Sequence, residues 1–134
     1  MNVVLDTNIL VSAFWSPNGK AAYVVKQIID GKINLCCDNR ILSEYREVLL
    51  RPKFQFDRWQ INSLLEFFEK DGIVVPDLLP DIFFADDSHI IFFEVAKFCN
   101  ATLVTGNLKH FPNDDSIISL TDYFFKFLKL FKLL

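Results

Sequence analysis

Acidic side chains at two points of the chain have the chemistry to hold a metal ion. Asp6 directly follows the apolar run Val3–Leu5, and a carboxylate at the end of a buried strand can bind a divalent cation. That position also suits a residue that caps the next helix, so both interpretations stay open. Glu44 lies at the edge of the apolar stripe of an amphipathic segment, facing either a cleft or solvent. Carboxylates placed in this way favour metal-dependent cleavage of a phosphodiester.

A second group of candidates surrounds the predicted start of a later helix. Asp86, Asp87 and His89 lie there, where acidic side chains either bind an ion or cap exposed backbone amides. His89 shares a helical column with Phe92, which suits a packed histidine as well as a ligand. Polar residues after the predicted strands are candidates for substrate binding: Asn8, Thr105, Asn107 and Lys109.

Several other chemistries are disfavoured by motifs that the chain lacks. No G-x-G-x-x-G pattern follows the first predicted strand, which argues against a dinucleotide cofactor. No P-loop and no G-x-S-x-G nucleophile elbow occur. Asp6-Thr7-Asn8 has an asparagine where a D-x-D phosphatase has its second aspartate, which disfavours a phosphatase as the function of this chain. The net charge of −3 gives no general attraction to duplex nucleic acid.

Short apolar runs alternate with amphipathic stretches, and this alternation predicts a parallel sheet covered by helices on both faces. We expect strands at residues 3–5, 33–37, 73–75, 102–105 and 117–119. We expect helices at residues 7–15, 20–30, 40–51, 57–70, 88–99 and from 121 to the end. The predicted fold class is therefore a three-layer α/β/α sandwich, and residues 1–134 have the length of one domain.

Composition points to a folded protein of a reducing compartment. Apolar residues make up 51% of the chain, which is too many for a disordered protein. Three cysteines fit neither a disulfide framework nor a zinc site, and no apolar run is long enough to span a membrane. With no signal peptide at the N-terminus, we expect a cytoplasmic protein without membrane association.

Three segments resemble the PIN-domain ribonucleases, specifically the bacterial PIN proteins that act as toxins in toxin–antitoxin modules. The matching segments are residues 3–13 (VVLDTNILVSA), 43–49 (SEYREVL) and 92–96 with 101–112 (FFEVA, ATLVTGNLKHFP). The resemblance implies an endoribonuclease that uses Mg²⁺ or Mn²⁺ bound by clustered acidic residues. It also implies an RNA substrate and a cognate antitoxin that restrains the enzyme.

The resemblance assigns the acidic ligands residue by residue. Asp6 matches the first ligand and Glu44 the second, whereas His89 and Asn107 stand where the family has its third and fourth aspartates. Asp86 is then the candidate for the third catalytic carboxylate, and His89 can add a nitrogen ligand, which favours Mn²⁺. These replacements also support the alternative of a catalytically degenerate PIN fold that binds RNA or protein.

The C-terminal segment, residues 123–134, departs from the family pattern. It is apolar apart from Lys126, Lys129 and Lys132. It is expected either to pack on the domain as a last helix or to expose an apolar face for a homodimer or an antitoxin. Binding to a membrane surface is the least favoured option.

Overall fold

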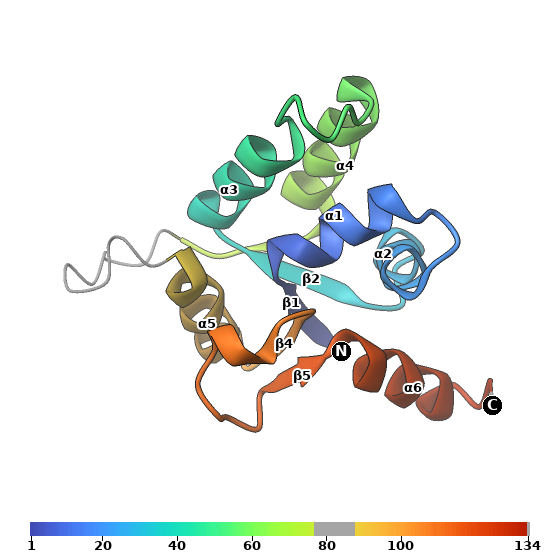
Figure 1. Cartoon of the computed structure of the whole chain (residues 1–134). Coiled ribbons are helices and arrows are strands. Elements are labelled where there is room, and N and C mark those ends of the chain that lie inside the picture. The colour runs from blue at the N-terminus through green and yellow to red at the C-terminus, as the bar shows by residue number, and fades with distance from the viewer. Residues whose placement is uncertain (77–87, 134) are drawn as a thin grey trace.

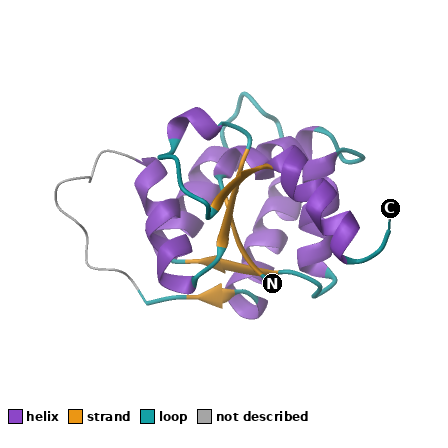
Figure 2. Ribbon diagram, turned by 90° about the horizontal axis from the view of Figure 1, so that it is seen from below, coloured by secondary structure: helices purple, strands orange, loops and turns teal. Residues whose placement is uncertain are grey.

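The computed structural model describes residues 1–76 and 88–133, which form a parallel sheet flanked by helices (Figure 1). Figure 2 shows the strands lying between helices on either side. The sheet has five strands in the order β3-β2-β1-β4-β5, and every neighbouring pair is parallel. The predicted α/β fold with a central parallel sheet is therefore confirmed.

The strands are β1 (Asn2–Leu5), β2 (Asn34–Cys37), β3 (Ile73–Val74), β4 (Thr102–Thr105) and β5 (Ile117–Ser119). The helices are α1 (Thr7–Trp15), α2 (Lys20–Ile29), α3 (Asn39–Leu49), α4 (Arg58–Asp71), α5 (Ser88–Cys99) and α6 (Leu120–Leu130). A short 3₁₀ helix, η2 (Leu108–His110), follows β4 and was not expected from the sequence. The last helix was expected from residue 121 to the chain end, but it begins at Leu120 and ends at Leu130.

The central strands are covered on both faces, which explains their continuous apolar sequence. Val3, Val4 and Leu5 of β1 are fully buried. Tyr45 of α3 packs in the core between Phe68 and Phe92. The centroid of the Tyr45 ring lies 6.2 Å from the ring centroid of each phenylalanine. Its hydroxyl donates to the carbonyl of Leu5 at 2.5 Å, so α3 is fixed to the end of β1 by a buried hydrogen bond.

Three buried or half-buried polar contacts set the position of α3. The Asp38 carboxylate is fully buried and accepts from the backbone amide of Ile41 at 2.9 Å, which caps the helix. The other carboxylate oxygen lies 2.8 Å from Nε of Arg40, whose Nη1 reaches Glu94 of α5 at 3.5 Å. Through these contacts α3 is held both to the end of β2 and to α5.

The C-terminal helix packs on the domain and also exposes apolar side chains. Tyr123 and Phe127 are buried, and Tyr23 of α2 meets Phe124 edge-on at 5.2 Å. Phe125, Leu130, Phe131 and Leu133 are between 41 and 57% exposed. No helix in the described part of the chain has the length and apolarity needed to cross a membrane.

The order of the strands creates a switch point beside β1. The chain proceeds from β1 to β2 and β3 on one side, and then places β4 and β5 on the other side. Ligands of open parallel sheets bind at the carboxyl ends of the strands at such a point. Asp6 follows β1 and Gly106 follows β4, so the switch point joins two of the turns singled out in the sequence.

Candidate functional site

A pocket of about 410 Å³ opens at the carboxyl edge of the sheet. Its walls come from the start of α1, from α3 and the turn after it, from the start of α5 and from η2. The lining residues are Asp6, Thr7, Asn8, Val11, Glu44, Val48, Arg51, Phe54, His89 and His110. The pocket thus gathers two carboxylates, two imidazoles and a guanidinium from segments far apart in the sequence.

Asp6 is buried beneath this pocket, with 4% of its surface exposed. It occupies the position that precedes α1, yet within the described chain its side chain makes no capping hydrogen bond. Instead Oδ2 accepts from the Thr105 hydroxyl at 2.7 Å, across the switch point. Of the two interpretations left open by the sequence, the side-chain helix cap is therefore wrong.

Glu44 reaches the same pocket from the second turn of α3. It is half-buried, and Oε2 accepts a hydrogen bond from the Thr7 hydroxyl of α1. Each carboxylate is thus held by one threonine hydroxyl. A donor that is fixed in this way restricts the orientation of the carboxylate that it binds.

The two turns at the switch point are fastened to each other. The backbone amide of Gly106 donates to Oδ1 of Asn8 at 3.2 Å. The backbone amide of Asn107 donates to Thr105 Oγ1 at 3.0 Å, so this one hydroxyl accepts from Asn107 and donates to Asp6. A short chain of hydrogen bonds therefore orients the buried carboxylate from the β4 side.

Two histidines close the pocket on the side of α5 and η2. The rings of His89 and His110 lie 4.5 Å apart between centroids, tilted by 45°. His89 also meets the ring of Phe111 edge-on at 5.4 Å. Nδ2 of Asn107 lies 3.0 Å from Nε2 of His110, so the turn after β4 is joined to this pair.

The structure brings together most of the residues that the sequence singled out. Asp6, Asn8, Glu44 and His89 line the pocket. Thr105 lies behind Asp6, and Asn107 bridges Thr105 to His110. Lys109 is exposed on η2 and is not among the described residues that line the pocket. Asp86 and Asp87, the candidates that precede α5 in the sequence, lie outside the described residues.

Thr7 and Phe54 were not selected from the sequence. The sequence pattern indicates Thr7 only as the start of a helix, although its i, i+4 spacing from Val11 places both residues on one face of α1. Phe54 belongs to the turn between α3 and α4, where no periodic pattern predicts which side chain faces the site. Glu44, Val48 and Arg51, at i, i+4 and i+7, do share a face, and that spacing gives the direction of the pocket.

The donor chemistry fits a hard divalent cation in part. Asp6 and Glu44 supply carboxylate oxygens, which Mg²⁺ and Mn²⁺ bind in proteins. Within residues 1–76 and 88–133, no group of three His, Cys, Asp or Glu side chains is close enough to hold an ion. Asp6 and Glu44 are therefore the two carboxylates that the described residues bring to this pocket.

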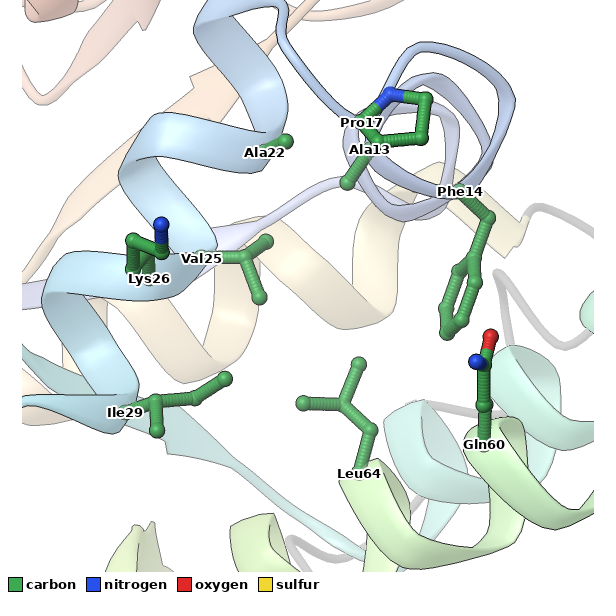
Figure 3. A pocket seen from close by; sticks show the side chains of 9 residues that line it. All are labelled: Ala13, Phe14, Pro17, Ala22, Val25, Lys26, Ile29, Gln60 and Leu64. Carbon is green, nitrogen blue, oxygen red and sulfur yellow. The ribbon is translucent and has the colours of Figure 1, made fainter.

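A second cavity, of about 320 Å³, has a different character (Figure 3). It lies between α1, α2 and α4 and is lined by Ala13, Phe14, Pro17, Ala22, Val25, Lys26, Ile29, Gln60 and Leu64. Figure 3 shows Val25 and Ile29 of α2 on one side of it and Leu64 of α4 on the other. This lining suits apolar contact, whereas the titratable groups gather at the carboxyl edge of the sheet.

The pocket lined by Asp6 and Glu44, the acidic pocket, lies at the switch point of the parallel sheet, where ligands of open α/β sheets bind. Residues 2–109 match the PIN domain family, so this chain belongs to the PIN domain family. It is 29% identical over 125 residues to MJ1680, an uncharacterized protein of Methanocaldococcus jannaschii, covering 91% of this chain and 76% of that protein.

A solved structure shares the fold. The crystal structure of VapBC2 from Rickettsia felis, bound to a DNA fragment from the VapBC2 promoter, superimposes on this chain with a TM-score of 0.60 and 20% sequence identity. The match covers 89% of this chain and 97% of the other.

Proposed function

We propose that this protein is a divalent-metal-dependent endoribonuclease of the PIN type, a toxin that a cognate antitoxin neutralises. The observation that carries the proposal is the convergence of Asp6 and Glu44 on one pocket, each held by a threonine hydroxyl. Membership of the PIN domain family supports nuclease chemistry at that pocket. We place the protein in the cytoplasm and treat residues 1–134 as one domain.

In this proposal Asp6 and Glu44 hold Mg²⁺ or Mn²⁺, with Asp86 as the third carboxylate and His89 as a nitrogen ligand. These residues would hold the ion where it would supply an activated water and stabilise charge on the attacked phosphate. The hydroxyls of Thr105 and Thr7 keep the two carboxylates oriented before metal arrives. Asn8, Asn107 and Lys109 are assigned to the RNA side of the site, whereas Thr105, expected from the sequence to bind substrate, is completely buried behind Asp6 and positions that carboxylate instead.

Cleavage and metal binding test the proposal separately. Asp6→Asn and Glu44→Gln remove charge without changing side-chain shape, and each is expected to lower metal-dependent RNA cleavage by at least 100-fold, about 3 kcal/mol of barrier. Glu66→Gln, at an exposed position of α4, is the matched control. Calorimetric titration with Mn²⁺ and Mg²⁺ should show binding that Asp6→Asn abolishes. Cleavage by Asp6→Asn at the normal rate would refute the proposal.

A catalytically degenerate PIN fold that binds RNA or protein is the second candidate. The observation that favours it is the incomplete ligand set among the described residues, with Asn107 engaged by His110. This candidate requires association that persists in Asp6→Asn and needs no metal. The absence of both cleavage and metal binding, with RNA or protein binding retained, would favour it over the nuclease.

The partners follow from the same comparison. The protein of similar fold was solved in the VapBC2 complex, which supports a protein partner for this chain. The exposed apolar residues of α6 are the surface at which we expect a homodimer or an antitoxin contact. Sedimentation of wild-type protein and of a Phe125→Glu variant tests the homodimer: a dimer that survives the substitution would exclude this part of α6 from its interface.

A further inference from the structure

We propose that Trp15, packed edge-on against Phe54, forms a stacking platform for an unpaired base of single-stranded RNA beside the candidate site. The inference rests on the proposed function for its choice of ligand and extends the site beyond the acidic pocket. Its first support is the place of Trp15 on α1. Thr7 and Val11 line the pocket, and Trp15 follows them at the same i, i+4 spacing on that side of the helix. The helical rise places Trp15 about 12 Å along α1 from Thr7.

The second support is continuity from the α3 side. Phe54 lines the acidic pocket and also meets the Trp15 ring edge-on, at 6.3 Å between centroids and an interplanar angle of 79°. Phe56 stacks on Phe54 at 5.1 Å with nearly parallel rings, and it meets Trp15 edge-on at 6.0 Å. The aromatic cluster thus begins inside the pocket and ends at Trp15.

The third support is that Trp15 is exposed but fixed. Trp15 is 65% exposed, whereas Phe54 and Phe56, its neighbours in the cluster, are half-buried. Hydrogen bonds inside the turn hold the two phenylalanines: the amide of Phe54 donates to the carbonyl of Arg51 at 3.1 Å, and that of Gln55 to Pro52 at 3.3 Å. A ring held in this way loses little freedom when a base stacks on it.

The charges beside the cluster suit a phosphate backbone. Arg51 lines the pocket, and the Lys53 amine lies 5.1 Å over the Phe54 ring. Arg51 is paired with Glu47 by a 2.9 Å contact, but both side chains are about half exposed or more, so the pair is weak and a phosphate can replace the carboxylate. Aromatic rings next to cationic side chains are the usual platform for single-stranded nucleic acid.

The test measures binding rather than cleavage, in buffer free of divalent ions. The Trp59→Phe variant leaves Trp15 as the sole tryptophan, so quenching of its fluorescence by a short unstructured RNA reports directly on the platform. We expect quenching on addition of RNA. Replacing one nucleotide by an abasic site is expected to weaken binding about 5- to 150-fold, the range for loss of one stacked base. Duplex RNA should quench little, because its bases are already stacked.

Four variants separate stacking from general shape and charge. Trp15→Leu and Phe54→Leu are expected to lower affinity for single-stranded RNA at least 5-fold, whereas Trp15→Tyr keeps a ring and should retain most of it. Lys53→Gln should reduce the salt dependence of binding. Circular dichroism spectra and melting curves confirm that each variant is folded.

Equal affinity for abasic and intact RNA, or wild-type affinity in Trp15→Leu, would overturn the platform. Failure of the proposed function has a different signature. In that case no RNA is cleaved with any divalent ion, while Trp15 quenching and the abasic penalty remain.

Discussion

Thr105 shows how one hydroxyl controls the candidate site. It is completely buried, donates to Asp6 Oδ2 at 2.7 Å and accepts from the backbone amide of Asn107 at 3.0 Å. Replacing it with an apolar side chain would leave a buried carboxylate and a backbone amide without this partner. Because unpaired buried groups are costly, the residue acts on both the stability of the fold and the orientation of Asp6.

Thr105→Val is expected to lower the free energy of unfolding by about 1–3 kcal/mol, since it keeps the shape of the side chain and removes only the hydroxyl. Urea unfolding followed by circular dichroism measures the change. Thr102→Val, three residues earlier on β4, makes the same substitution at the far end of the strand and serves as the control. If Thr105→Val were no less stable than Thr102→Val, the hydroxyl would have no structural role.

The positions of Asp6 and Glu44 could be predicted from the sequence, but the groups that hold them could not. A residue that follows a buried strand must lie at the edge of the sheet, and this placed Asp6 directly. The bonds from Thr7 to Glu44 and from Thr105 to Asp6 span 37 and 99 residues. They depend on how α1, α3 and β4 pack, which local patterns do not encode.

At the scale of elements, the start of α3 is held by both a cap and an ion pair. Asp38 caps it, is fully buried and pairs with Arg40 at 2.8 Å. Asp57 caps α4 through a 3.0 Å bond from the amide of Gln60, but it lies on the surface. The two caps therefore form a matched pair that differs in burial and in the ion pair.

Asp57→Ala is expected to cost about 0.5–2 kcal/mol of stability, as loss of an exposed cap does. Asp38→Ala should cost more, because the Arg40 guanidinium also loses its buried partner. Asp38→Asn keeps the acceptor for the Ile41 amide and should fall between wild type and Asp38→Ala. Chemical denaturation of the three variants gives the ranking, and equal losses for Asp38→Ala and Asp57→Ala would show that the ion pair adds nothing.

The end of α4 depends on a glycine for close packing. A side-chain carbon on Gly72 would lie 2.5 Å from the carbonyl oxygen of Phe68 and 3.2 Å from that of Leu35. Gly72→Ala is therefore expected to cost about 1–3 kcal/mol through overpacking. Gly31→Ala is a control for backbone strain alone, since Gly31 has φ of +81° and open space around it. A stable Gly72→Ala protein would show that the turn into β3 shifts easily.

Element types could be predicted from the sequence more fully than element ends. Apolar periodicity distinguishes strands from helices, and each predicted strand and helix has a counterpart in the structure. The start of α6 is set by a single side-chain hydrogen bond: Ser119 accepts from the amide of Asp122 at 3.1 Å, so the helix begins at Leu120. The 3₁₀ helix at Leu108–His110 has no periodic signal because it is only one turn long.

At the scale of the whole molecule, burial raises the pKa of two cysteine thiols and two tyrosine hydroxyls and so keeps them protonated. Desolvation, with a smaller contribution from the neighbouring cysteines, raises the pKa of the Cys36 thiol to about 12. Desolvation and the nearby charge of Asp38 raise the pKa of Cys37 to about 12. Desolvation also raises the pKa of Tyr123 to about 12, and it holds the pKa of Tyr45 well above its usual value.

These shifts predict that the free energy of unfolding falls as pH rises through the alkaline range. Between the ordinary pKa of the unfolded groups, about 8.5 for cysteine and about 10 for tyrosine, and the folded value near 12, only the unfolded chain releases these protons. The folded state thus binds more protons there, so stability is complete below about pH 8 and declines above it. Urea unfolding at pH 7.5, 9 and 10.5 measures the decline.

Thiol chemistry gives an independent check on the same groups. Since the thiolate is the reactive form, Cys36 and Cys37 should resist iodoacetamide in the native protein at pH 8.5 and react quickly in guanidinium chloride. Cys37→Ala removes one proton-release site, so its stability should fall less steeply with pH than that of the wild type, even though its absolute stability is lower. Equal slopes in the two proteins, together with rapid native-state alkylation of Cys37, would mean that this thiol ionises as easily in the folded core as in the unfolded chain.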